Sequence, residues 1–399
     1  KPQYYEIFYF ITFLFHFHLN HIFMGGGSSK DVVKLENSLG PLLQDVLIGS
    51  VEELLNDEDW EEQKQTPWPF DKGRLEKINY KKIIKEDKPW KDKLFPPDDT
   101  SLFIDDKCHR DAAVSEKKRS WNEYKWMKVS KFFEDSIQTR KFVLFDKIEP
   151  EDVKQGNLDN TTLMATLSGI AERDMMAEEA ATSLAGASVR DMFLTQVVNG
   201  AGCYAIKFCI NGLDKVVVVD DYLPFKKNKK GEYQFAFAKS TTGENEIWMM
   251  LVEKAWAKVC GSYEATELTS IEEAFEVLAG GPTQTYDIEH YKGDIRRAGA
   301  AREERLDKLW HVIDEGNRKG WVTTVSSVPM PKEMGIIRDE ASLRWISIDN
   351  KGIKYNHTYT VLDARPVTLA NKYTDLLVQI RNPSNKNNRG EQWKGDWNP

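Results

Sequence analysis

Four residues of the chain have thiols that could act as nucleophiles, metal ligands or disulfide partners: Cys108, Cys203, Cys209 and Cys260. Their spacing contains neither a CxxC pair nor the pattern of a metal site. Few cysteines without paired spacing are typical of proteins in a reducing, intracellular compartment. We therefore interpret each as a small, buried apolar side chain rather than as a reactive group.

A second candidate for chemistry is the run M-G-G-G-S-S at residues 24–29. If translation begins at Met24, this run fits the myristoylation pattern M-G-x-x-x-S, and Gly25 is the residue that would receive the lipid. A single acyl chain supports only marginal membrane binding, and Lys30 is the basic residue beside it. The alternative interpretation is a flexible glycine-serine start. We expect membrane association only with the lipid.

Length and composition indicate several domains with enough apolar residues for a packed core. The length suggests about two to three domains, and 41% of the 399 residues are hydrophobic. The formal net charge is −8 and we identify no basic block, so nucleic acid is not expected as a partner. We interpret residues 1–23 as a leader of doubtful status, because their apolar run is shorter than a membrane span and lacks a signal-peptide cleavage pattern. Residues 24–87 follow as a partly flexible N-terminal extension.

Apolar spacing predicts three helices. The first lies within residues 161–182, where leucine and isoleucine recur at helical intervals. The second runs over residues 247–258, with Gly261 as its stop. The third includes residues 306–313, with acidic residues before it and two glycines near its end.

Short runs rich in β-branched residues and bounded by Gly, Asn, Asp or Pro predict strands. These runs are residues 205–210, 216–219, 321–325, 359–361 and 376–380. Helices are expected to dominate up to about residue 268 and strands after about residue 320. The sequence therefore predicts an α+β fold.

Six segments, in the same order along the chain, resemble the calpain family of cysteine peptidases. They are residues 95–103, 155–165, 201–224, 244–265, 356–361 and 380–383. The resemblance covers roughly residues 88–399 and implies a papain-like core. In that core a helical lobe at 88–268 and a β-rich lobe at 269–399 are separated by a cleft. Because the family continues beyond this point with further strands, we expect a truncated or incomplete lobe, or an open sheet edge that a partner covers.

The resemblance places a threonine at the position of the nucleophile. Residues 155–165 read Q-G-N-L-D-N-T-T-L-M-A, whereas the family reads Q-G-x-L-G-D-C-W-L-L-A. Thr161 therefore stands for the cysteine and Thr162 for the tryptophan. A papain-type cysteine paired with histidine has a pKa of ~3–4 and is a thiolate at neutral pH. A threonine hydroxyl stays protonated there, and threonine serves as a nucleophile when it is the first residue and uses its own amine, which the internal Thr161 lacks.

The resemblance assigns the other catalytic positions to three residues. His357 is the general base, Asn382 orients its imidazole, and Gln155 is the oxyanion donor. In the family a tryptophan shields the histidine–asparagine hydrogen bond, and here Ser384 stands in its place. The alternative interpretations are that His357 is retained for hydrogen bonding or packing and that Gln155 supports its own loop.

Calcium is the one cofactor that the resemblance implies. Calpain cores bind this ion through carboxylates and carbonyl oxygens, and Asp152 and Glu246 occupy the two acidic positions of the first-lobe site. The alternative is that both make ordinary surface or helix-cap contacts. At the second-lobe site the acidic positions are Gln392 and Pro399, so we expect that site to be lost.

Two functional hypotheses follow. The first is a catalytically inactive, calpain-like scaffold that binds other proteins inside the cell, in the cytoplasm or in a cytoskeletal or ciliary assembly. The second is a calcium-dependent cysteine-type endopeptidase, which the family would imply. The second requires a thiol in the nucleophile segment, where none of the four cysteines lies.

Overall fold

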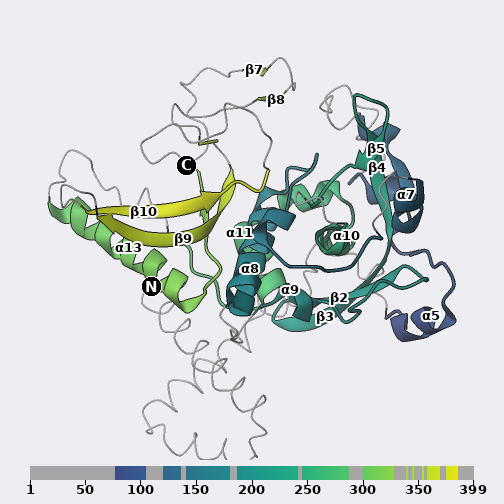
Figure 1. Cartoon of the computed structure of the whole chain (residues 1–399), viewed down its shortest axis with the longest axis horizontal. Helices are drawn as coiled ribbons and strands as arrows, with labels where there is room; N and C mark the ends of the chain where they lie inside the picture. The colour runs from purple at the N-terminus through teal and green to yellow at the C-terminus, as the bar shows by residue number, and fades with distance from the viewer. Residues whose placement is uncertain are drawn as a thin grey trace, which may run out of the picture. The chain divides into compact units, whose positions relative to one another are not determined.

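Short antiparallel sheets alternate with helices throughout the described part of the chain, as an α+β fold requires (Figure 1). The computed structural model describes residues 77–104, 120–135, 141–179, 187–240, 245–286, 300–327, 338–339, 344–345, 353–354, 357–368 and 374–384. All of them belong to one compact unit, Phe70–Pro399. No described helix is long and apolar enough to span a membrane.

The helices are α5 (Tyr80–Glu86), α7 (Val129–Asp135), α8 (Thr161–Glu179), α9 (Val189–Met192), α10 (Trp248–Cys260), α11 (Ile271–Ala279) and α13 (Ala300–Lys319). Between them lie the 3-10 turns η2 (Asp99–Ser101), η3 (Ser120–Glu123), η4 (Pro150–Asp152) and η5 (Glu264–Leu268).

The strands are β1 (Lys125–Lys128), β2 (Cys203–Ile210), β3 (Leu213–Asp220), β4 (Tyr222–Lys227), β5 (Tyr233–Phe235), β6 (Thr324–Ser326), β7 (Arg338–Asp339), β8 (Arg344–Trp345), β9 (Thr358–Thr368) and β10 (Thr374–Arg381). They form the antiparallel sheets β1-β4-β5, β10-β9-β6, β2-β3 and β7-β8.

Helix α10 is buried along nearly its whole length. Most of its apolar residues belong to the large core cluster that also includes buried residues of α8, β2 and β3, while Ala257 belongs to a second cluster. Two lysines of α10 are buried as well. Lys254 pairs with Asp220 at the end of β3, and the Nζ atom of Lys258 lies 2.7 Å from Oδ2 of Asp92. A buried charge is tolerated only with a partner, so these pairs connect α10 to β3 and to the segment that follows α5.

Strands β9 and β10 form a long antiparallel pair, and Figure 1 shows α13 running beside it. Helix α8 contacts the first residues of β9. The hydroxyl of Thr360 donates to the carbonyl oxygen of Ala165 at 2.8 Å, and a side chain on Gly169 would meet Val322 at 2.8 Å. The missing side chain at Gly169 therefore allows the close approach of α8 to this sheet.

The structure confirms most of the predicted elements. Helices α8 and α10 match their predictions, and Gly261 follows α10 in the left-handed conformation at φ 99°. The strand expected at residues 321–325 begins later, at Thr324. The reason is that the Trp321 N–H donates to the Gly316 carbonyl at 2.8 Å and so completes the end of α13.

Helices were expected to dominate up to about residue 268, and the described helices there cover more residues than the strands. Strands β2 and β3 were predicted, whereas β1, β4 and β5 were missed. Strand β1 reads K-W-M-K and gives a weak local signal, because two of its four residues are lysines. It is a strand because Trp126 pairs with Pro224 and Met127 with Leu223, almost a hundred residues away. Such strand formation depends on tertiary context more than on intrinsic propensity.

Candidate active site

Thr161 begins helix α8. The helix forms because Leu163, Leu167 and Ile170 recur at helical spacing and are fully buried. Thr161 itself is half-buried, and the buried Asn160 precedes it. The structure thus places a secondary hydroxyl, and no thiol, at the N-terminal end of this helix.

The loop that contains Gln155 is fixed by two hydrogen bonds from this residue. The backbone N–H of Gln155 donates to the carbonyl oxygen of Pro383 at 2.9 Å, and the side-chain Nε2 of Gln155 donates to the carbonyl oxygen of Leu158. Gly156 follows, and a Cβ atom there would lie 2.1 Å from the carbonyl oxygen of Phe237. One hydrogen of the Gln155 amide thus engages its own loop, and a role as oxyanion donor stays a prediction.

His357 and Asn382 are hydrogen-bonded to each other, with 2.8 Å between Nε2 and Oδ1. His357 is the residue before β9 and Asn382 the residue after β10. The two strands pair so that Arg381 lies opposite Thr360, which brings their ends together. The two residues that the family resemblance singled out are therefore adjacent in space.

Ser384 determines which imidazole nitrogen carries hydrogen. Its backbone N–H donates to Oδ1 of Asn382 at 2.9 Å, and its hydroxyl donates to the same atom at 2.8 Å. A backbone N–H can only donate, so the atom it contacts is the amide oxygen, and Nε2 of His357 must then be the donor. Ser384 is buried. It therefore supports the asparagine by hydrogen bonds where the family uses a tryptophan shield.

Arg381, at the end of β10, connects the β9–β10 pair to helix α8 and to the loop that precedes it. Its Nη1 donates to the Ser168 hydroxyl at 3.0 Å, and its Nη2 donates to the Val153 carbonyl at 2.8 Å. Burial lowers the pKa of this guanidinium, and nearby acidic groups, Glu151 first, oppose the effect. Together with the Thr360 contact to α8, these bonds place the four predicted site residues on one connected framework.

Sequence reasoning missed a buried carboxyl beside the nucleophile position. Glu253 of α10 accepts from Asn160 Nδ2 and from the Ala238 N–H, each at 2.9 Å. Burial raises the pKa of Glu253 to about 7, against the smaller effect of these two hydrogen bonds. The resemblance implies an aspartate at the position of Asn160, so here an amide donor would replace a second carboxylate. The signal was present in the motif L-V-E-K-A, but its partner could not be read from sequence.

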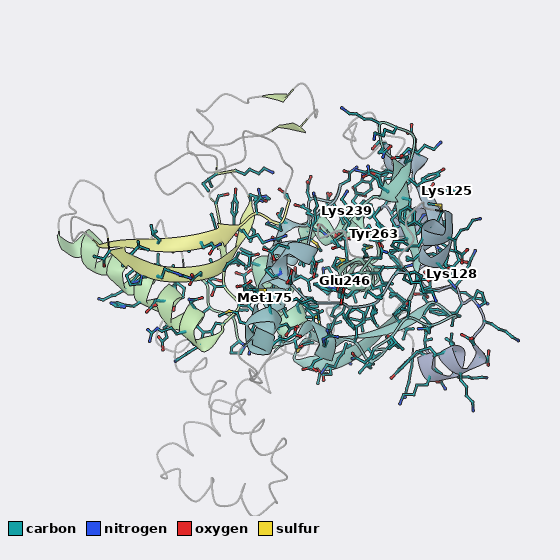
Figure 2. All side chains as sticks on the ribbon, viewed as in Figure 1. Lys125, Lys128, Met175, Lys239, Glu246 and Tyr263 are labelled. Carbon is teal, nitrogen blue, oxygen red and sulfur yellow. The ribbon has the colours of Figure 1, made fainter. Side chains whose placement is uncertain are left out.

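Asp152 and Glu246 are both buried, which excludes surface contacts for them. Oδ2 of Asp152 accepts from the Glu149 N–H at 2.9 Å, as part of a capping box at η4. Glu246 accepts from the Asp146 N–H and from Trp248 Nε1, the latter at 2.9 Å, and Figure 2 shows it among packed side chains. Within the described ranges, no three His, Cys, Asp or Glu side chains are grouped to hold a metal ion. Calcium binding at these two carboxylates stays a prediction.

Several predicted features lie outside the described residues. They are the leader, the acylation candidate Gly25, Cys108, and the second-lobe positions Gln392 and Pro399. The other three cysteines are free thiols that are buried or half-buried. Burial raises the pKa of Cys203 to about 12, which agrees with its interpretation as an unreactive side chain.

Comparison with protein families identifies the class of this protein. Residues 90–399 match the model of the calpain family cysteine protease, which is most of the chain. The chain therefore belongs to the calpain family.

Relatives with curated names are similar to parts of the chain. The calpain-type cysteine protease ADL1 of Oryza sativa subsp. japonica is 28% identical over 319 residues, which are 79% of this chain and 12% of that protein. The calpain-1 catalytic subunit of Rattus norvegicus is 34% identical over 182 residues, or 45% of this chain and 20% of the subunit. The human calpain-1 catalytic subunit is 26% identical over 309 residues, or 77% and 35%. The chain thus spans only a minor part of the length of these relatives.

Proposed function

We propose that this calpain-family chain is a catalytically inactive scaffold that binds other proteins. The observation that supports it is the threonine at the predicted nucleophile position, at the start of α8, in a chain whose histidine–asparagine pair is still assembled. Removal of the nucleophile from such a catalytic unit costs nearly as much rate as removal of the whole unit. A chain that keeps the fold but lacks the nucleophile can still bind other proteins, which is the function of a scaffold.

The competing function is a calcium-dependent cysteine-type endopeptidase. One relative is named a calpain-type cysteine protease. This competing function requires a nucleophile that attacks a peptide carbonyl at neutral pH. The Thr161 hydroxyl would have to lose its proton to His357 without the acidity of a thiol.

Peptidase activity on an unfolded substrate such as casein tests this proposal. We expect no cleavage by the wild type, with or without calcium, above the rate of buffer alone. The variant with Thr161→Cys and Thr162→Trp restores the family residues and measures whether the rest of the site is competent. Adding His357→Ala to that variant is the matched control, because any rescued activity must depend on the base.

Cleavage by the wild type that disappears in Thr161→Ala and in His357→Ala would overturn the proposal. A calcium requirement for such cleavage would support a first-lobe ion at Asp152 and Glu246.

We further propose that the scaffold acts inside the cell, in the cytoplasm or a cytoskeletal or ciliary assembly. Localisation of the tagged full chain by microscopy tests that part separately.

A further inference from the structure

A cluster of lysines surrounds the hairpin between β4 and β5, although the whole chain has a net charge of −8. The hairpin reads F-K-K-N-K-K-G-E-Y over residues 225–233, and Lys227, Lys229 and Lys230 are exposed. The fold adds the exposed Lys125 from β1, about a hundred residues earlier, because Lys125 pairs with Phe225. Figure 2 labels Lys125 on its strand. We name Lys125, Lys227, Lys229 and Lys230 the basic patch.

Two ammonium groups of the basic patch converge on one aromatic ring. Nζ of Lys125 lies 5.3 Å, and Nζ of Lys227 5.6 Å, from the centroid of the Tyr233 ring. None of the four lysines makes an ion pair or a side-chain hydrogen bond among the described residues. Within the described part of the chain no carboxylate neutralises these four charges, and an anion from outside would do so.

The turn that presents the basic patch is held in place by Asn228. Its Oδ1 accepts from the backbone N–H groups of Lys230 and Glu232, at 2.8 and 3.0 Å. Its Nδ2 donates to the Glu232 carboxylate at 2.8 Å, which engages the acidic side chain of the turn. Gly231 supplies the left-handed residue at φ 83°. A preorganised turn loses little conformational freedom when it binds a ligand.

We infer that the basic patch binds a segment of a partner protein that is rich in aspartate and glutamate. This inference gives the proposed scaffold function a class of partner. Lysines recognise carboxylates as mobile point charges and do not demand a fixed geometry. The remainder of the chain carries a net negative charge and repels an acidic segment, so attraction is confined to the basic patch.

Two other polyanions fit the basic patch less well. Single-stranded nucleic acid needs aromatic faces on which bases stack, but the Tyr233 ring is half-buried and lies beneath two ammonium groups. Membrane-surface segments combine basic residues with exposed apolar ones that enter the bilayer. Among the described residues, the exposed large apolar side chains all lie outside β1 and the β4–β5 hairpin.

Fluorescence anisotropy with a labelled octaglutamate peptide tests the inference on the full chain. The patch variant replaces Lys125, Lys227, Lys229 and Lys230 with glutamine. The control variant makes the same replacement at four exposed lysines near α5, namely Lys77, Lys81, Lys85 and Lys88. Both variants lower the formal net charge equally, and thermal denaturation confirms that each is folded.

At 20 mM salt we expect the patch variant to bind octaglutamate roughly 30-fold more weakly than the wild type, because it loses four exposed charge–charge contacts. The control variant should stay within about twofold of the wild type, and octaglutamine should not bind. An equal loss in both variants would overturn the inference, as would tighter patch-dependent binding of phosphatidylserine vesicles or of oligothymidylate. The octaglutamate experiment and the peptidase assay are independent. A negative result for the basic patch therefore leaves the proposed loss of catalysis unchanged, and a positive peptidase result leaves the binding measurement unchanged.

Discussion

Replacing Glu253 by glutamine should remove a pH dependence of stability that the wild type shows between weakly acidic and neutral pH. Glu253 is 1% exposed, and its two hydrogen-bond donors, Asn160 Nδ2 and the Ala238 N–H, are both uncharged. Burial raises the pKa of this carboxyl from 4.5 to about 7. The folded state therefore favours the protonated form more than the unfolded state does.

The sign and the size of the effect follow from that pKa. Stability from this group is fully present below pH 4.5 and is lost as the pH rises through about 7. Each pH unit inside that window costs about 1.4 kcal/mol, so the total loss is roughly 3 kcal/mol. Glutamine stays neutral at every pH and has nearly the same shape.

Urea denaturation followed by tryptophan fluorescence, at pH 5 and at pH 8, measures this effect. The free energy of unfolding of Glu253→Gln relative to wild type should rise by roughly 2–3 kcal/mol from pH 5 to pH 8. Other titrating groups cancel in this difference, and Glu123→Gln, at an exposed position, should show no such change. A difference between wild type and Glu253→Gln that is the same at both pH values would refute the reasoning. Conversely, Asn160→Asp should steepen the dependence, because it places a second carboxyl beside Glu253.

Two further predictions concern the framework. Lys254→Met should lower the free energy of unfolding by about 3–5 kcal/mol, because it leaves the buried Asp220 charge unpaired; a thermal midpoint equal to that of the wild type would contradict this. Gly156→Ala should cost about 1–3 kcal/mol, since its Cβ would lie 2.1 Å from the Phe237 carbonyl oxygen. Gly281→Ala is the matched control, because its nearest neighbour is 4.0 Å away, and equal losses in both glycine variants would show that the close contact is not the cause.

Local sequence was sufficient for the long helices. Helix α8 and helix α10 each place apolar residues on the spacing of a helical turn, and Gly261 ends α10 because it adopts the left-handed conformation there. These signals lie within a few residues of one another, so they can be read without knowing the rest of the fold. The weak strands β1 and β5 have no comparable signal, because their residues become a strand only by pairing with β4.

The sequence also carried the resemblance that assigns Thr161, His357, Asn382 and Gln155 to the catalytic positions of the family, and that assignment stays a prediction. It did not determine what those residues contact. The hydrogen bond between His357 and Asn382 depends on the register of β9 with β10, including a shift at Gln379 and Ile380. Likewise, Glu253 meets Asn160, and Lys125 joins the β4–β5 hairpin, across about a hundred residues of chain. Residue types and local periodicity can be read directly from the sequence. Contacts between distant segments form only when the strands pair and the core packs, so they require the tertiary structure.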